Sequence, residues 1–183
     1  MTENTTTAGD AQDAARLRSA YLPMDRRHAL AQGVALPERC VGSALFADIS
    51  GFTPLTEALA QALGPRRGME ALLEHLNAVY TALIAEVHRY RGSVIGFAGD
   101  AITCWFDEAG PGHGERGADG STPCSSLPAS AARAVACAVA MQQAMAPYTA
   151  IPVPDHGPAT LGIKVAVASG SARRLLAGDP EIQ

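Results

Sequence analysis

The sequence predicts an α+β domain in which helices pack on an antiparallel β-sheet. Apolar runs of strand length alternate with longer segments of helical periodicity, and a Gly-Asp pair joins two β-prone runs as a tight hairpin. Helices that are interleaved with such a hairpin indicate a sheet with helices on one face. The chain has 183 residues, of which 48% are hydrophobic, so about one domain with its own core is expected.

The first strand and the first helix of the domain are expected on either side of a polar turn. Residues 41–47 form an apolar run with small side chains, which is typical of a buried strand. Thr53 is expected as the N-cap of a helix that has Pro54 at its first position. We expect this helix to run to about Ala62 and to end at the Gly-Pro pair that follows.

A long helix and a hairpin come next. Apolar residues recur at spacings of three and four over residues 68–90, which predicts an amphipathic helix. Residues 93–98 and 101–106 are short β-prone runs, with Gly99 between them at a position that favours positive φ. Asp100 is therefore expected at the hairpin tip, exposed and held by its flanking strands.

The remaining elements complete the sheet. Residues 107–128 are dense in Gly, Pro, Ser and charged residues, so a flexible loop is expected there. A helix is predicted at about 129–146 and an extended linker at 150–158. Two strands are predicted at 161–168 and 172–177, joined by a Ser-Gly-Ser turn. This order of elements is typical of a ferredoxin-like antiparallel sheet with helices packed on it.

Composition excludes several classes of protein and partner. The net charge is −4 and the isoelectric point is near 5.7, so no basic surface for nucleic acid is indicated. There is no run of 18 apolar residues and no signal-peptide pattern, which predicts a cytoplasmic protein without a transmembrane segment. The four cysteines lack metal-ligand spacing, and Cys104 and Cys137 are expected to be buried thiols. Residues 1–33 are predicted to be a partly disordered N-terminal arm, and residues 34–183 the folded domain.

Two sequence motifs contain the candidate catalytic residues. FADISGFTPLTE spans residues 46–57 and GFAGDAITCWF spans residues 96–106, and each places one aspartate, Asp48 or Asp100, at the end of a strand. Two carboxylates at strand ends are suited to holding divalent metal against a triphosphate. Because the first strand is expected beside the hairpin, we expect both carboxylates to converge.

The turn after Asp48 has the features of a phosphate-binding segment. Ser50, Gly51, Phe52 and Thr53 lead into a helix N-terminus, where free backbone N–H groups point toward an anion. We expect these residues to contact the β- and γ-phosphates through the backbone more than through side chains.

Together the two motifs resemble the class III nucleotidyl cyclase catalytic domain, and within it the branch of soluble, bicarbonate-responsive adenylyl cyclases. The resemblance covers residues 41–183, and we expect the family domain to continue beyond Gln183. It implies an adenylate cyclase that converts ATP to 3′,5′-cyclic AMP and pyrophosphate. It also implies two Mg²⁺ or Mn²⁺ ions, bound by Asp48, Asp100 and the backbone carbonyl of Ile49. The family active site forms between two cyclase domains, in cis or in a homodimer, so the isolated chain is expected to be inactive.

One position departs from the family pattern and leaves alternatives open. Gly96 stands where many adenylyl cyclases carry a lysine that reads adenine, so the base-recognition residue is unknown. A second domain can select the base, or the substrate can be GTP or a pyrimidine triphosphate. A third alternative is a regulatory nucleotide-binding module without turnover.

Four other residues are interpreted without a catalytic role. Lys164 is expected as an edge charge, and Trp105 as a core or dimer-interface residue. Arg173 and Arg174 are interpreted as a solvated pair, with a phosphate or a partner domain as the alternative contact.

Overall fold

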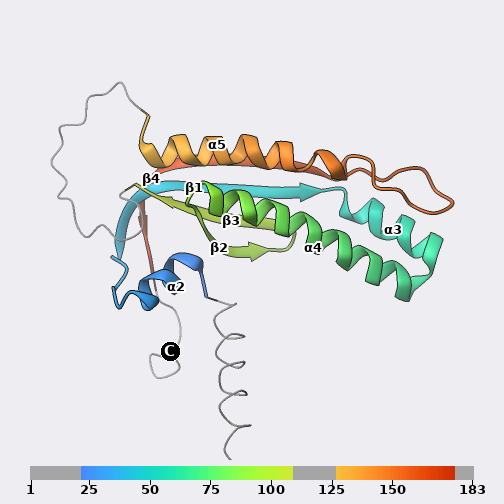
Figure 1. Ribbon diagram of the computed structural model, residues 1–183, viewed down its shortest axis with the longest axis horizontal. Coiled ribbons are helices and arrows are strands. Elements are labelled where there is room, and N and C mark those ends of the chain that lie inside the picture. The colour runs from blue at the N-terminus through green and yellow to red at the C-terminus, as the bar shows by residue number, and fades with distance from the viewer. Residues whose placement is uncertain (1–21, 109–126, 176–183) are drawn as a thin grey trace, which may run out of the picture.

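The computed structural model describes residues 22–108 and 127–175, and its centre is a four-stranded antiparallel sheet (Figure 1). The strand order is β2-β3-β1-β4, so the first strand along the chain lies between the third and the fourth. This is the ferredoxin-like order, and the predicted α+β fold is confirmed. The strands are β1 (Arg39–Ser50), β2 (Ser93–Ala98), β3 (Ala101–Asp107) and β4 (Gly162–Arg173).

The helices that follow β1 and β3 form a layer on one face of the sheet. Their buried side chains form one core with the strands, and α5 runs along the sheet (Figure 1). α2, from the predicted N-terminal arm, lies on the other side of the sheet from α5 (Figure 1). The helices are α2 (Met24–Ala31), α3 (Phe52–Leu63), α4 (Pro65–Arg89) and α5 (Ala129–Ala144), followed by the 3₁₀ helix η1 (Ala146–Tyr148).

The two faces of the sheet differ because successive side chains of a strand point to opposite sides. Leu45, Ala47 and Ile49 of β1 point toward the helices and are at most 1% exposed. Phe46, on the other side of β1, is 50% exposed. We call this second side the open face. Directly paired residues share a face, so the open face consists of Cys40, Gly42, Ala44, Phe46, Asp48, Ser50, Ser93, Gly96, Ala98, Ala101, Thr103, Trp105, Asp107, Gly162, Lys164, Ala166, Ala168, Gly170 and Ala172.

The prediction of two separate C-terminal strands is wrong. β4 is one strand of 12 residues, and it pairs with all 12 residues of β1, from Arg39 opposite Arg173 to Ser50 opposite Gly162. The Ser-Gly-Ser sequence stays in the ladder because Ser169 and Ser171 find partners in β1. The Ser169 hydroxyl also lies 2.7 Å from the Ser43 hydroxyl, within hydrogen-bond distance.

The start of α3 also differs from the prediction. Gly51, with φ of +100°, is the N-cap, and helical geometry begins at Phe52, so Thr53 lies inside the first turn. A Cβ at residue 51 would collide with the carbonyl oxygen of Thr160. Glycine is required here because it tolerates both the positive φ and this close approach.

The predicted 150–158 linker is more ordered than expected. Ile151 and Val153 are 3% and 5% exposed, and Ile151 forms an isolated β-bridge with Ala159. The two apolar residues extend the core beyond η1.

Both ends of the range 107–128, which was predicted to be a loop, contact the regular structure. Asp107 belongs to β3, and the Glu108 carboxylate accepts hydrogen bonds from the backbone N–H groups of Ala129 and Ser130 at the start of α5. Residues 109–126, like residues 1–21 of the arm, lie outside the described part of the chain.

Candidate active site

Asp48 and Asp100 are brought together by the pairing of β1 with β3. Asp48 lies opposite Ala101, the residue that follows Asp100. The backbone N–H of Ile49 donates a hydrogen bond to the carbonyl oxygen of Asp100, with an N to O distance of 3.4 Å. Gly99, with φ of +63°, makes the hairpin turn, as predicted. Two carboxylates that are distant in the sequence therefore lie at one end of the sheet.

Both carboxylates are available for a ligand. Asp48 and Asp100 are exposed, and among the described residues neither forms an ion pair. Asp100 lies close enough to Tyr80 of α4 for its charge to affect the pKa of the Tyr80 hydroxyl. Burial raises the pKa of the Tyr80 hydroxyl, and the negative charge of Asp100 raises this pKa further. The Tyr80 ring packs edge-to-face on Phe97 of β2 at a centroid distance of 5.6 Å, which fixes the hairpin on α4.

The donor set at this end fits a magnesium-like ion. The N–H and C=O of a residue in an antiparallel strand point to the same side, so the Ile49 carbonyl points toward the hairpin tip. Two carboxylates and one carbonyl are all oxygen donors, and Mg²⁺ typically takes only one or two protein carboxylates beside water and phosphate. Within residues 22–108 and 127–175 there is no group of three His, Cys, Asp or Glu side chains placed to hold a metal. The remaining ligands would come from water and substrate.

The turn after Asp48 presents free donors. Pro54 has no N–H, and the N–H of Leu55 is already bonded to the carbonyl of Gly51 at 3.2 Å. The N–H groups of Phe52 and Thr53 have no acceptor within the helix, because they belong to its first turn. A helix N-terminus of this kind favours an anion.

Lys164 lies beside Asp48, a position that the sequence did not reveal. It lies directly opposite Asp48 in the β1–β4 pairing, and both side chains are exposed on the open face. Directly paired side chains in an antiparallel sheet are about 5 Å apart at Cβ. The sequence placed Lys164 only at the start of a strand, and the register of that strand was needed to locate it beside Asp48.

Gly96 lies on the same face, opposite Thr103 of β3. A Cβ built at residue 96 meets no atom within 4 Å. The position therefore has room for a side chain but supplies no group to read a base.

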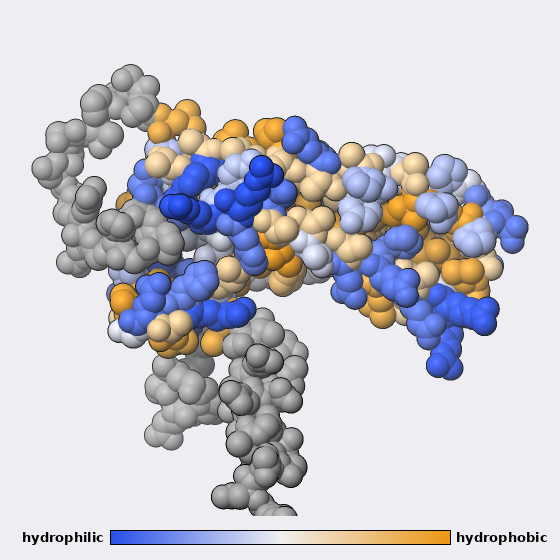
Figure 2. Space-filling model, in the orientation of Figure 1, coloured by the Kyte–Doolittle hydropathy of each residue, from blue (hydrophilic) through white to orange (hydrophobic). Residues whose placement is uncertain are grey.

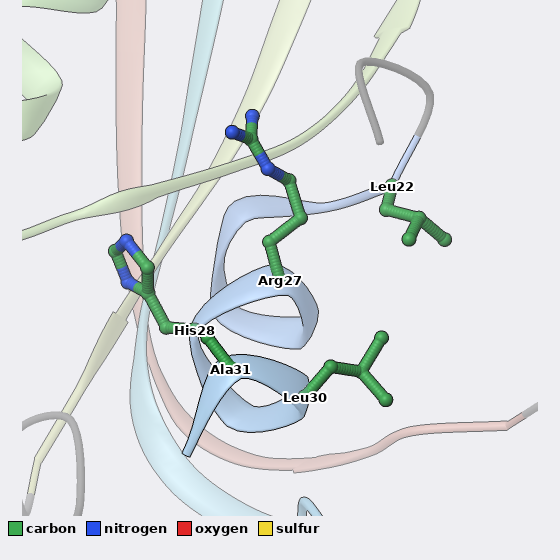
Figure 3. Close-up of a pocket in the computed structure, with 5 residues that line it drawn as sticks. All are labelled: Leu22, Arg27, His28, Leu30 and Ala31. Carbon is green, nitrogen blue, oxygen red and sulfur yellow. The ribbon is translucent and has the colours of Figure 1, made fainter. Parts of the chain in front are cut away.

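The site is an exposed surface at the end of the sheet. Figure 3 shows a hollow lined by Leu22, Arg27, His28, Leu30 and Ala31, which belongs to the surface of α2 and contains neither aspartate. Hydrophilic and hydrophobic side chains are intermixed over the face shown in Figure 2. In the described ranges, no helix is long and apolar enough to cross a lipid bilayer.

Comparisons with known proteins support the resemblance drawn from the motifs. No protein-family model matches the chain. A stretch of 61 residues, 33% of the chain, is 43% identical to adenylate cyclase type 10 of Rattus norvegicus and of Homo sapiens. The chain spans only 4% of the length of these relatives.

Solved structures agree in fold. One structure of a bacterial light-regulated adenylyl cyclase matches 94% of this chain and 44% of its own, with a TM-score of 0.62 and 14% identity. A second structure with the same description matches 97% of this chain and 48% of its own, with a TM-score of 0.60 and 14% identity. At 14% sequence identity, these matches show a similar fold and nothing more. The resemblance to class III nucleotidyl cyclase catalytic domains is confirmed by this fold together with the matched stretch of sequence.

Proposed function

We propose, with the likeness to nucleotidyl cyclases as the premise, that this chain supplies the metal-binding half of a cyclase active site. The reaction is the conversion of ATP to 3′,5′-cyclic AMP and pyrophosphate. The observation that carries the proposal is the β1–β3 register, which places Asp48 beside the hairpin tip that bears Asp100. Both carboxylates are exposed, so a hydrated ion can reach them.

In the proposed reaction the ribose 3′-oxygen attacks the α-phosphorus and pyrophosphate leaves. Two Mg²⁺ or Mn²⁺ ions, when bound, lower the pKa of the attacking hydroxyl and neutralise the leaving group. Asp48, Asp100 and the Ile49 carbonyl are the protein ligands of these ions.

The chain also contributes groups that orient the triphosphate. The N–H groups of Gly51, Phe52 and Thr53, with Ser50 at the start of the turn, bind the β- and γ-phosphates at the positive end of α3. The ammonium of Lys164 lies on the same face, opposite Asp48, and adds a positive charge beside the phosphates.

Base recognition is assigned to a second cyclase domain, in cis or as a second copy. The space at Gly96 supports this, because this chain offers no side chain at the position where the family carries its lysine. If the second domain selects another base, the same metal site serves a guanylyl or a pyrimidine cyclase.

A second candidate is a regulatory module that binds a nucleoside triphosphate without turnover. Gly96 favours it, since a domain that has lost a base-reading residue can retain its metal and phosphate groups. This candidate predicts metal-dependent triphosphate binding and no cyclic product.

The test is cyclic-nucleotide formation from ATP, GTP, CTP and UTP with Mg²⁺ or Mn²⁺, on this chain and on the longest protein that contains it. Cyclic AMP that is lost in both Asp48→Asn and Asp100→Asn would support the cyclase. Asp155→Asn is the matched control, because Asp155 is an exposed acid in the loop between η1 and β4. Product formation that survives both substitutions would refute the proposed site. A cyclic product from GTP, CTP or UTP alone would show that ATP is not the substrate. Binding of a triphosphate without any cyclic product would favour the regulatory module.

A further inference from the structure

α2 covers one end of the open face. Its Asp25 carboxylate lies 3.3 Å from Nε of Arg174, just beyond the end of β4. Nη2 of the same guanidinium donates to the carboxylate of Asp107 on β3 at 3.1 Å. The side chains of Arg174, Asp25 and Asp107 are only 21%, 14% and 31% exposed. The interpretation of Arg174 as a solvated residue is therefore wrong.

Burial along β1 shows how far this cover extends. Cys40 and Phe46 belong to the same strand and the same face, yet Cys40 is 8% exposed and Phe46 is 50% exposed. Burial raises the pKa of the Cys40 thiol, and the charges of Arg174, Asp107 and Asp25 all act on it. The cover therefore reaches Cys40 and ends before the part of the face that carries Asp48.

Trp105 occupies the same covered end. A Cβ at Gly42 would lie 2.6 Å from Cζ2 of the Trp105 indole, so the ring covers that glycine. Among the described residues, the buried indole N–H of Trp105 has no hydrogen-bond partner, and neither has the buried Nη1 of Arg174. Unpaired buried donors cost free energy, which weakens the docked arrangement.

α2 docks on the sheet with few fully buried apolar side chains. Ala29 is its only buried residue, at 9% exposed, whereas Leu30 is 59% exposed. Leu22, just before the helix, is 37% exposed, and Figure 3 shows it with Leu30 on the side of α2 away from His28. α2 also packs against β2. Because one alanine buries little apolar surface, the partly buried ion pair of Asp25 with Arg174 is an important contact that holds α2 at the end of β4.

We infer that α2 is a releasable strap on the open face, latched by Arg174 between Asp25 and Asp107. Release uncovers Cys40 and the Trp105 ring, and makes the open face continuous from Asp48 to the far end of the sheet. The docked strap limits the surface on which a second cyclase domain can pack, and its release promotes that packing. This regulatory role rests on the proposed function, whereas the latch is a property of the fold.

Cys40 provides a direct test of the latch. The chain carries Cys124→Ser, because Cys124 lies outside the described residues, and thiol labelling by an aromatic disulfide reagent is followed with time. Cys40 reports release of the strap, whereas Cys104 and Cys137, both 0% exposed in the core, report unfolding. Asp25→Asn removes the charge of the latch on α2. Glu38→Gln is the matched control, because Glu38 pairs with Arg173, next to Arg174, and lies outside α2.

The expected result is labelling of one thiol at least tenfold faster in Asp25→Asn, with the Glu38→Gln rate unchanged. An unchanged rate in Asp25→Asn would overturn the latch, and so would labelling of three thiols together, which signals unfolding. In the cyclase assay, Asp25→Asn is expected to raise cyclic-nucleotide formation. Unchanged formation with an exposed Cys40 would overturn the regulatory role. A lack of cyclic product from every variant would count against the proposed function, and the thiol rates would still decide the latch.

Discussion

Lys164 lies directly opposite Asp48 across the β1–β4 pair, and it is the only lysine in the sequence. An ammonium beside a carboxylate that is proposed to bind metal has two opposed effects. It repels a divalent cation from the empty site, and it attracts the negative triphosphate once substrate arrives.

The first prediction follows from these opposed effects. Lys164→Gln should weaken binding of a metal–triphosphate complex by about tenfold, which is about 1.4 kcal/mol. It should also strengthen binding of Mn²⁺ alone by a few-fold. Calorimetric titrations with Mn²⁺ and with a non-hydrolysable triphosphate measure both constants, and Lys164→Arg is the control that keeps the charge. If both ligands weakened together, the opposed roles assigned to Lys164 would be wrong.

The second prediction concerns the stability of the protein with and without metal at the proposed site. Because Asp48 and Asp100 are exposed, Asp48→Asn and Asp100→Asn should change the free energy of unfolding by less than about 0.5 kcal/mol. Wild-type protein should melt at a higher temperature in Mn²⁺ than in chelator, since a ligand of the native state stabilises it. Neither variant should show this rise. A metal-induced rise that persists in both would place the ions elsewhere.

The third prediction compares two glycines with positive φ. Gly51→Ala should destabilise the domain by more than about 2 kcal/mol, because strain at φ of +100° adds to the collision with the Thr160 carbonyl. Gly99→Ala should cost only about 1 kcal/mol, because a Cβ there meets no atom within 4 Å. Urea unfolding of both variants measures the difference. Equal losses would show that the Thr160 contact is unimportant.

The fourth prediction concerns base selection at residue 96. Gly96→Lys should leave the free energy of unfolding within about 0.5 kcal/mol of wild type, because the position is open. The new ammonium should favour ATP over UTP by about tenfold, as a charged hydrogen bond to the base would. Competition binding of the four triphosphates measures the preference. An unchanged order of affinities would mean that the base does not lie near this strand.

The fifth prediction concerns alkaline pH. Burial raises the pKa of Cys104 and of Cys137 to about 12, from an ordinary value of 9.0. The native state then retains these two protons at pH values where the unfolded chain has released them. The resulting stability is fully present below about pH 9 and is lost as pH rises toward about 12, by up to about 1.4 kcal/mol per pH unit for each thiol.

Urea unfolding at several alkaline pH values measures this slope. Cys104→Ala and Cys137→Ala should each reduce it, even though each also loses packing in the core. A slope that is unaffected by either substitution would assign the alkaline loss to other groups.

Much of the fold is local and was therefore accessible from the sequence. The apolar spacing of three and four marked α4, and Gly99 marked the hairpin, because helical periodicity and positive φ depend on residues close together in the chain. Asp48 and Asp100 were found for the same reason, since each ends its own strand. The Ser-Gly-Ser segment was misread as a turn because its hydrogen bonds go to residues of β1 that are distant in the sequence.

What the sequence determined by itself is the set of elements and the positions of the two aspartates along them. The tertiary structure decided which residues meet. Only the register of β4 against β1 placed Lys164 opposite Asp48. Only the packing of α2 made Arg174, which the sequence indicated to be solvated, a partly buried link between Asp25 and Asp107. Such pairings arise when separate elements dock and bury apolar surface. The free energy gained by that burial depends on residues far apart in the chain, so no local sequence pattern indicates it.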